Sequence, residues 1–299
     1  MQTTTTTTTT AYFNAETGTT NWEEMWRQED GEDTQPKFDC RRTGESIIII
    51  IILASFISVS RKEHASSLLP SWFVRFYTRW WSKVSLVALD VNSPLSSSSV
   101  VVSLFISNAE PALVTFLAAN TGFVPELLET KKTQGGARIL VPGCGRGYAL
   151  ETLSSTFDSE NVVGLEVSET ARRACEAYQT ERASKAKCII DDFFTHAIPS
   201  DDDDRKYDVV YDCTFLCAIQ PKQRTQWAEQ MKMLTKKGSR LISVVFPLGD
   251  FEGGPPFALS PELVTSLLQN DFDVEESIEV PEDDWARGKP EYLCVFRRR

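Results

Sequence analysis

A glycine loop between two apolar runs is the feature that most restricts how this chain folds. The run Ile139–Val141 stops at glycines in alternate positions of 143–147, and a helical pattern follows. A second apolar run, Val162–Leu165, then ends in Glu166. Glycines allow a sharp turn and a close approach of a ligand to the backbone, and an acid at the end of the second strand can accept from ribose hydroxyls. The pattern predicts the first β-α-β unit of a nucleotide-binding sheet.

The spacing within this unit narrows the class of ligand. Glu166 lies 23 positions after Gly143, close to the ~20 typical of a ribose-binding acid. The glycines follow G-x-G-x-G, whereas a dinucleotide site follows G-x-G-x-x-G. This spacing favours S-adenosylmethionine, which has no pyrophosphate to bind, over NAD.

Strands and helices alternate through the rest of the carboxyl-terminal part. Further strands are expected at Lys187–Ile190, Tyr207–Tyr211, Leu241–Phe246, Phe272–Val280 and Tyr292–Phe296. Helices are expected over roughly 169–182 with Ser168 as its cap, from Pro221 to Gly238, and from Ser260-Pro261 onward. The last two strands leave little room for a crossover helix, so they should pair antiparallel. The predicted fold class is α/β, Rossmann-like, with a seven-stranded, mostly parallel sheet and an antiparallel last strand.

Charge and cysteine content restrict partners and compartment. The net charge of −11 argues against a nucleic-acid partner, because phosphate binding needs a basic face. The seven cysteines are scattered without a C-x-x-C pair, and there are two histidines, so no metal site is expected. Buried free thiols fit a reducing, cytoplasmic setting.

The chain divides by composition into four parts. These are a disordered Thr-rich tail (1–11), an acidic amino-terminal segment (12–40), an atypical insertion (41–108) and the α/β domain (109–299). The insertion holds the apolar run Ile47–Val59, which is shorter than the ~20 residues that cross a bilayer. Residues 93–107 are of types that pyrimidine-rich codons mostly encode, as before a splice acceptor, which favours a translated intron over roughly 41–108. A membrane-associating segment is the alternative. If the chain contacts a membrane at all, the contact is expected through this insertion alone.

Several motifs together resemble the thiopurine S-methyltransferase family, and most closely its thiol, thiocyanate and halide methyltransferase branch. The resemblance covers about 20–38 and 109–299. The motifs are Leu-Val-Pro-Gly-Cys-Gly-Arg-Gly-Tyr (140–148), Val-Gly-Leu-Glu-Val-Ser-Glu-Thr-Ala (163–171), Asp-Asp-Phe-Phe (191–194), Tyr-Asp-Cys-Thr-Phe-Leu-Cys-Ala-Ile-Gln-Pro (211–221), Phe-Pro (246–247) and Gly-Gly-Pro-Pro-Phe (253–257).

The resemblance implies a set of residues that bind S-adenosylmethionine. Gly143 and Gly145 would meet its amino-acid portion and Glu166 its ribose. Asp192 and Phe193 would bracket the adenine, with core packing as the alternative for the ring. In the amino-terminal segment, Trp22 and Trp26 would form a lid over the sulfonium, where a cation gains roughly 0.5–2 kcal/mol from a ring face. The alternative is an amphipathic helix with two buried tryptophans. Phe38 stands where a tryptophan is more usual. Cys213 stands where a tyrosine is frequent, so the backbone there would still contact the cofactor but any role of a phenol is lost.

The reaction implied is methyl transfer to a small soft nucleophile such as a thiol, bisulfide, thiocyanate or a halide ion. These acceptors need no strong general base, and no catalytic residue is assigned. An apolar acceptor pocket is expected among Phe215, Phe246, Phe257 and Trp285, while Arg146 could attract an anion or pair with a carboxylate. The alternatives are another small acceptor atom (O, N or As), or an inactive, cofactor-binding or membrane-attached variant. A monomer is the default expectation.

Overall fold

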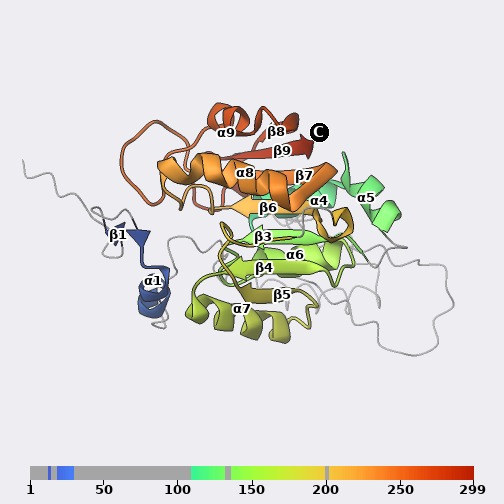
Figure 1. The fold of residues 1–299 in the computed structure, drawn as a ribbon, viewed down its shortest axis with the longest axis horizontal. Helices are drawn as coiled ribbons and strands as arrows, with labels where there is room; N and C mark the ends of the chain where they lie inside the picture. Colours follow the sequence, from blue (N-terminus) through green and yellow to red (C-terminus); the bar gives the residue numbers. More distant parts are fainter. Residues whose placement is uncertain (1–12, 15–18, 30–108, 132–135, 199–201) are drawn as a thin grey trace, which may run out of the picture. The chain divides into compact units, whose positions relative to one another are not determined.

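The computed structural model describes residues 13–14, 19–29, 109–131, 136–198 and 202–299 (Figure 1). The predicted tail (1–11), the insertion (41–108) and Phe38 lie outside the described residues. None of the described helices is both long enough and apolar enough to cross a membrane.

One mixed sheet of seven strands organises the described α/β part, in the order β5-β4-β3-β6-β7-β9-β8. Its strands are β3 (Ile139–Pro142), β4 (Val162–Glu166), β5 (Lys187–Ile190), β6 (Tyr207–Cys213), β7 (Thr235–Val245), β8 (Phe272–Glu279) and β9 (Tyr292–Arg298). The first five strands pair in parallel, and β9 is antiparallel to both β7 and β8. The predicted sheet with its antiparallel last strand is therefore confirmed.

Helices connect the strands and cover both faces of the sheet. They are α4 (Pro111–Ala119), α5 (Val124–Lys131), α6 (Tyr148–Thr156), α7 (Glu169–Glu181), α8 (Arg224–Leu234) and α9 (Pro261–Leu268), with the short 3-10 turns η2 (Asp203–Arg205), η3 (Pro221–Gln223) and η4 (Glu282–Asp284). The amino-terminal segment contributes a two-stranded ladder, β1 (Phe13–Asn14) with β2 (Thr19–Thr20), and the helix α1 (Trp22–Glu29).

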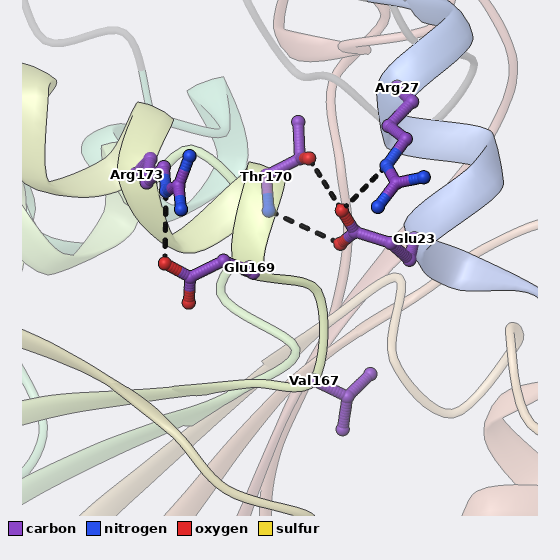
Figure 2. Close-up of a pocket in the computed structure, with 6 residues that line it drawn as sticks. All are labelled: Glu23, Arg27, Val167, Glu169, Thr170 and Arg173. Carbon is purple, nitrogen blue, oxygen red and sulfur yellow. Dashed lines mark hydrogen bonds and ion pairs between the residues drawn. The ribbon is translucent and has the colours of Figure 1, made fainter.

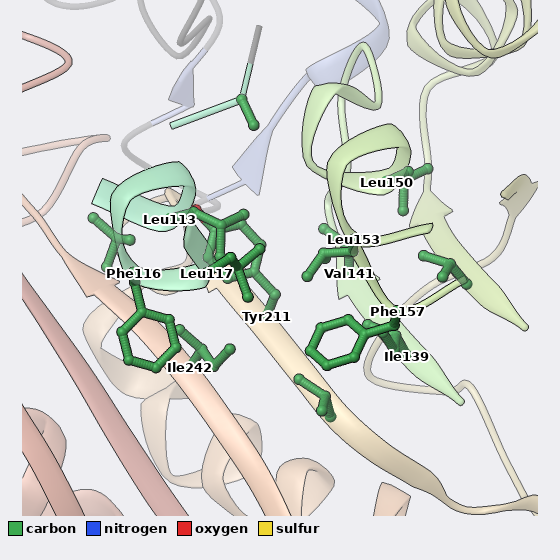
Figure 3. Close-up of a cluster of buried hydrophobic side chains, with 14 of the residues drawn as sticks. Leu113, Phe116, Leu117, Ile139, Val141, Leu150, Leu153, Phe157, Tyr211 and Ile242 are labelled. Carbon is green, nitrogen blue, oxygen red and sulfur yellow. The ribbon is translucent and has the colours of Figure 1, made fainter. Parts of the chain in front are cut away.

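Two apolar cores lie on opposite faces of the sheet, because successive side chains of a strand point to opposite faces. Ile139 and Val141 belong to the core that α4 and α6 cover (Figure 3). Leu140, between them, belongs to the core that α8 and α9 cover. Every residue of β3 is buried, as expected for a central parallel strand with helices on both faces.

Two of the predicted helix caps are present. The hydroxyl of Ser168 accepts from the N–H of Ala171 at 3.2 Å, and that of Ser260 accepts from the N–H of Leu263 at 3.1 Å. In each helix a hydroxyl satisfies one of the backbone donors that the first turn leaves without a partner.

The predicted end of the helix after Pro221 is wrong. Helix α8 ends at Leu234, and the chain passes directly into β7, so that Gly238 lies within a strand. Strands β6 and β7 change register between Tyr207 and Val209, and Gly238 has a φ of +87° at this irregularity. The glycine therefore serves a β-bulge instead of a helix terminus.

Strand β4 approaches the glycine loop so closely that Gly164 has no room for a side chain. A Cβ at this position would lie 2.4 Å from the Sγ of Cys144 and 2.8 Å from the Cδ1 of Leu150.

We expect Gly164→Ala to lower the free energy of unfolding by about 1–3 kcal/mol, because it overpacks this contact. Urea unfolding measures the loss. In a Cys144→Ala background the loss should shrink, since the nearest sulfur is gone. An equal loss in both backgrounds would contradict the steric explanation.

Candidate active site

The glycine loop joins the carboxyl end of β3 to the start of α6. Gly143, Gly145 and Gly147 have φ values of +56°, +52° and +76°, which side chains rarely tolerate. The N–H of Cys144 donates to the carbonyl of Leu165 at 3.1 Å and so fixes the loop to the end of β4. The sequence therefore folds this loop into one compact turn at the carboxyl edge of the sheet, where ligands of open α/β sheets bind.

Glu166 holds this edge together from the end of β4. Its Oε2 accepts from the N–H of Gly145 at 3.1 Å, and its Oε1 accepts from the N–H groups of Val167 and Ser168 at 2.9 and 3.0 Å. Burial raises the pKa of this carboxyl above its ordinary value, although the three N–H donors oppose the shift. A carboxylate offers about four lone-pair sites, so one remains for an external donor such as a ribose hydroxyl.

Two apolar side chains next to Glu166 are exposed to solvent. Val167 is 50% exposed and Ile190 is 49% exposed. The two lie at the carboxyl ends of neighbouring strands, because Glu166 of β4 pairs with Ile190 of β5. Asp192 follows in an exposed turn, in which its Oδ1 accepts from the N–H of Phe194 at 2.9 Å. The face of a nucleobase placed here would cover apolar surface and meet an acid.

Helix α1 lies against the glycine loop through Trp26. This side chain is buried, and its ring atoms would lie 3.2–3.3 Å from a Cβ at Gly145. The guanidinium of Arg146 lies 5.9 Å from the centre of the Trp26 ring. Trp22, half-buried, belongs to the same small cluster with Met25 and Ala171. The predicted tryptophan pair thus faces the loop and the start of α7.

A carboxylate on α1 fastens this helix to the amino terminus of α7 (Figure 2). Glu23 accepts from the hydroxyl and the N–H of Thr170 at 2.7 and 3.2 Å, as Figure 2 shows. It also accepts from the hydroxyl of Ser168 at 2.6 Å. The two hydroxyl hydrogen bonds lower the pKa of Glu23 to about 2. A cavity of about 380 Å³ opens beside this contact and is lined by Glu23, Arg27, Val167, Glu169, Thr170 and Arg173. Sequence reasoning did not anticipate the Glu23 contact, which joins segments far apart in the chain.

Phe193 belongs to an aromatic group on the other side of the loop. It is buried and meets Phe194 and Phe215 edge to face, with ring centres 5.4 and 5.0 Å apart. Phe215 in turn lies against Gly143, where a Cβ would come within 2.7 Å of its ring. In this arrangement Phe193 packs as a core residue, and Phe215 is the ring that touches the loop.

A buried polar cluster occupies the same edge of the sheet farther along. The thiol of Cys213, at the end of β6, donates to Oε2 of Glu110 at 3.4 Å. Arg287 reaches the same oxygen at 3.4 Å with Nη2, and Oε2 of Glu291 at 3.4 Å with Nη1. Its guanidinium lies 4.8 Å from the centre of the Phe246 ring, just beyond the end of β7. Of these residues, sequence analysis singled out Cys213 and Phe246.

The carboxyl groups of Glu110 and Glu291 in this cluster are both buried. Glu110 is 2% exposed and Glu291 is 0% exposed. Burial, together with the charge of Glu110, raises the pKa of Glu291 to about 8. Glu291 is therefore protonated near neutral pH and adds no negative charge beside Arg287.

The other two aromatic candidates are held by one side-chain and one backbone hydrogen bond. The indole N–H of Trp285 donates to the carbonyl of Val280 at 2.9 Å, and the N–H of Phe257 donates to the carbonyl of Cys217 at 2.7 Å. The structure thus gathers the expected site residues into two groups. One surrounds the loop with Trp26, Gly145 and Glu166, and the other surrounds Cys213.

We expect the buried Glu291 to make the protein less stable as the pH rises. Its pKa is 4.5 in an ordinary setting and about 8 in the folded chain, so the free energy of unfolding should fall between these pH values. Glu291→Gln should flatten this fall above about pH 6. Burial raises the pKa of Asp212 to about 6, so its part of the slope, at lower pH, should remain.

Urea unfolding at a series of pH values measures this profile. The exposed Glu229 of α8 supplies the matched control, and Glu229→Gln should leave the profile unchanged. If the free energy of unfolding fell equally with pH in wild type and Glu291→Gln, Glu291 would not be the source of the pH dependence.

We expect Glu23→Ala to release α1 from α7, because the substitution removes three hydrogen bonds to Ser168 and Thr170. Amide hydrogen exchange over 22–27 should become faster. The exposed neighbour Glu24 gives the control, since Glu24→Ala changes the same helix without touching this contact. Equal protection in both variants would show that α1 is held by its tryptophans alone.

The residues around the loop fit S-adenosylmethionine on three counts. The backbone of the loop is free of side chains at its glycines, Glu166 keeps one lone-pair site, and Val167 and Ile190 leave apolar surface exposed beside it. The loop would hold the amino-acid portion, Glu166 the ribose, and Val167 with Asp192 the adenine.

Comparison with known proteins places this architecture in a family. Residues 118–291 match the family model for thiopurine S-methyltransferase. A probable thiol methyltransferase 2 from Arabidopsis thaliana is 37% identical over 175 residues, which cover 58% of this chain and 73% of that protein. A thiocyanate methyltransferase 1 from Brassica oleracea is 34% identical over 150 residues, which cover 50% of this chain and 63% of that protein. The chain thus spans less than two thirds of this second relative.

Among solved structures, a magnesium protoporphyrin IX methyltransferase from Synechocystis with bound S-adenosylmethionine superposes with a TM-score of 0.46. Its sequence is 14% identical, over 78% of this chain and 99% of that chain, a similarity too low to add to the argument. The family match covers more than half of the chain and agrees with the sheet order and the glycine loop. This chain belongs to the thiopurine S-methyltransferase family, and its methyl donor is S-adenosylmethionine.

Proposed function

We propose that this protein transfers a methyl group from S-adenosylmethionine to a small soft nucleophile, such as a thiol, bisulfide, thiocyanate or a halide ion. The observation that carries the proposal is the family match, together with relatives named as thiol and thiocyanate methyltransferases. Two groups of residues lie at the carboxyl edge of the sheet, one around the glycine loop and one around Cys213. This arrangement supports separate sites for the methyl donor and the acceptor.

The residues around the glycine loop would position the donor. When bound, S-adenosylmethionine supplies an electrophilic methyl group on a positively charged sulfur. Glu166 would orient the donor from the end of β4, and Trp26 would shield the loop from water. Such positioning is the main contribution to an in-line displacement, for which effective molarities are large.

The polar cluster around Arg287 would receive the acceptor. Its guanidinium is planar and weakly hydrated, and it lies over the ring of Phe246, so it suits a large soft anion better than an ammonium would. The half-buried Cys213 lies beside it.

The thiols of the described part support a reducing compartment such as the cytoplasm. Cys144, Cys175, Cys188, Cys213, Cys217 and Cys294 are all free. Disulfides are uncommon in such compartments.

Headspace gas chromatography tests the proposal directly. The full chain is incubated with S-adenosylmethionine and bisulfide, thiocyanate or iodide, and we expect methanethiol, methyl thiocyanate or iodomethane. The same assay on a chain without 41–108 shows whether the insertion is needed. Intact binding of S-adenosylmethionine without any volatile product would reject these acceptors.

Arg287→Lys separates the acceptor site from the donor site. Lysine keeps the charge but loses the planar fork and its stacking on Phe246. We expect a higher KM for the anionic acceptor and an unchanged affinity for S-adenosylmethionine in calorimetry. Weaker binding of S-adenosylmethionine by Arg287→Lys would show that Arg287 belongs to the donor site, and would contradict its assignment to the acceptor site.

A further inference from the structure

Three cysteines from separate elements meet directly beneath the glycine loop. Cys144 belongs to the loop itself, Cys175 to α7 and Cys188 to β5. Their Sγ atoms all lie within 4.8 Å of one another, and those of Cys144 and Cys188 are 3.3 Å apart. The donor and acceptor groups described above do not use these thiols.

The surrounding backbone is shaped around the three sulfur atoms. A Cβ at Gly147 would lie 2.3 Å from the Sγ of Cys175, and a Cβ at Gly164 would lie 2.4 Å from that of Cys144. Cys175 and Cys188 are buried, whereas Cys144 is half-buried and gives the cluster its contact with the loop surface. The glycines thus leave a pocket that the sulfurs fill.

We propose that Cys144, Cys175 and Cys188 form a binding site for a thiophilic trivalent ion of the arsenic type. Three sulfurs at ~2.3 Å from one centre are about 4 Å apart in a planar arrangement, and closer in a pyramidal one. The observed separations need only a small adjustment to reach such a geometry. Thiolates select soft ions.

Coordination number and charge favour a trivalent ion over zinc. The group contains three ligands in the described part of the chain, whereas structural zinc takes four. A buried net charge is costly unless it is compensated. Three thiolates around a trivalent centre are neutral, while zinc would leave a negative charge beneath the loop.

The binding step balances without an oxidant. Arsenous acid exchanges its three hydroxyl groups for three thiols, so that three As–O bonds break and three As–S bonds form. Each thiol proton leaves with one hydroxyl as water, and arsenic stays trivalent. The product would tie the glycine loop to α7 and β5.

The test uses the full chain, kept reduced with a phosphine and incubated with arsenite. After desalting, elemental analysis should find one arsenic per chain, and X-ray absorption should find three sulfur neighbours. Amide exchange over 143–147 should slow on binding. Arsenic with two sulfur neighbours, or none retained, would overturn the proposal.

Variants locate the site. Cys144→Ser, Cys175→Ala and Cys188→Ser should each abolish retention of stoichiometric arsenic, with circular dichroism confirming that they fold. Cys217→Ala removes a buried thiol outside the cluster and should retain arsenic fully. Equal retention by all four variants would overturn the site. Retention of zinc but not of arsenic would overturn the trivalent assignment.

Discussion

The carboxylate of Glu166 is the interaction on which the rest of the site depends. It gathers the N–H groups of Gly145, Val167 and Ser168, and so joins the glycine loop, the end of β4 and the start of α7. A buried carboxylate is costly unless its oxygens accept hydrogen bonds. Because these donors are backbone groups, the acid and the Cys144–Leu165 hydrogen bond together fix the loop to the end of β4.

The helix α7 links this junction to the rest of the molecule. Ser168, at its start, accepts from Ala171 and donates to Glu23, so a single hydroxyl both caps the helix and holds α1. About two turns further on, Cys175 reaches under the loop. Displacement of α1 and binding of an ion by the thiols would therefore both act on α7.

Much of the fold could be predicted because its strands are apolar runs that end in recognisable turns. β5 and the cap Ser168 lie where the sequence placed them. The end of α8 could not be predicted, since Gly238 signals a helix terminus and a bulge equally well. Arg287, Glu110 and the thiol cluster were missed because their members lie far apart in the chain, without a short spacing to mark them.

The close packing of Gly164 against Cys144 has a consequence for how substitutions at these positions combine. The Sγ of Cys144 occupies the volume that a side chain on β4 would need. The Cβ of Cys144 and the Cδ1 of Leu150 would each also lie 2.8 Å from a Cβ at Gly164, so a larger residue there needs both neighbours to give way. Substitutions at positions 144, 150 and 164 are therefore coupled, and their effects on the free energy of unfolding should not add.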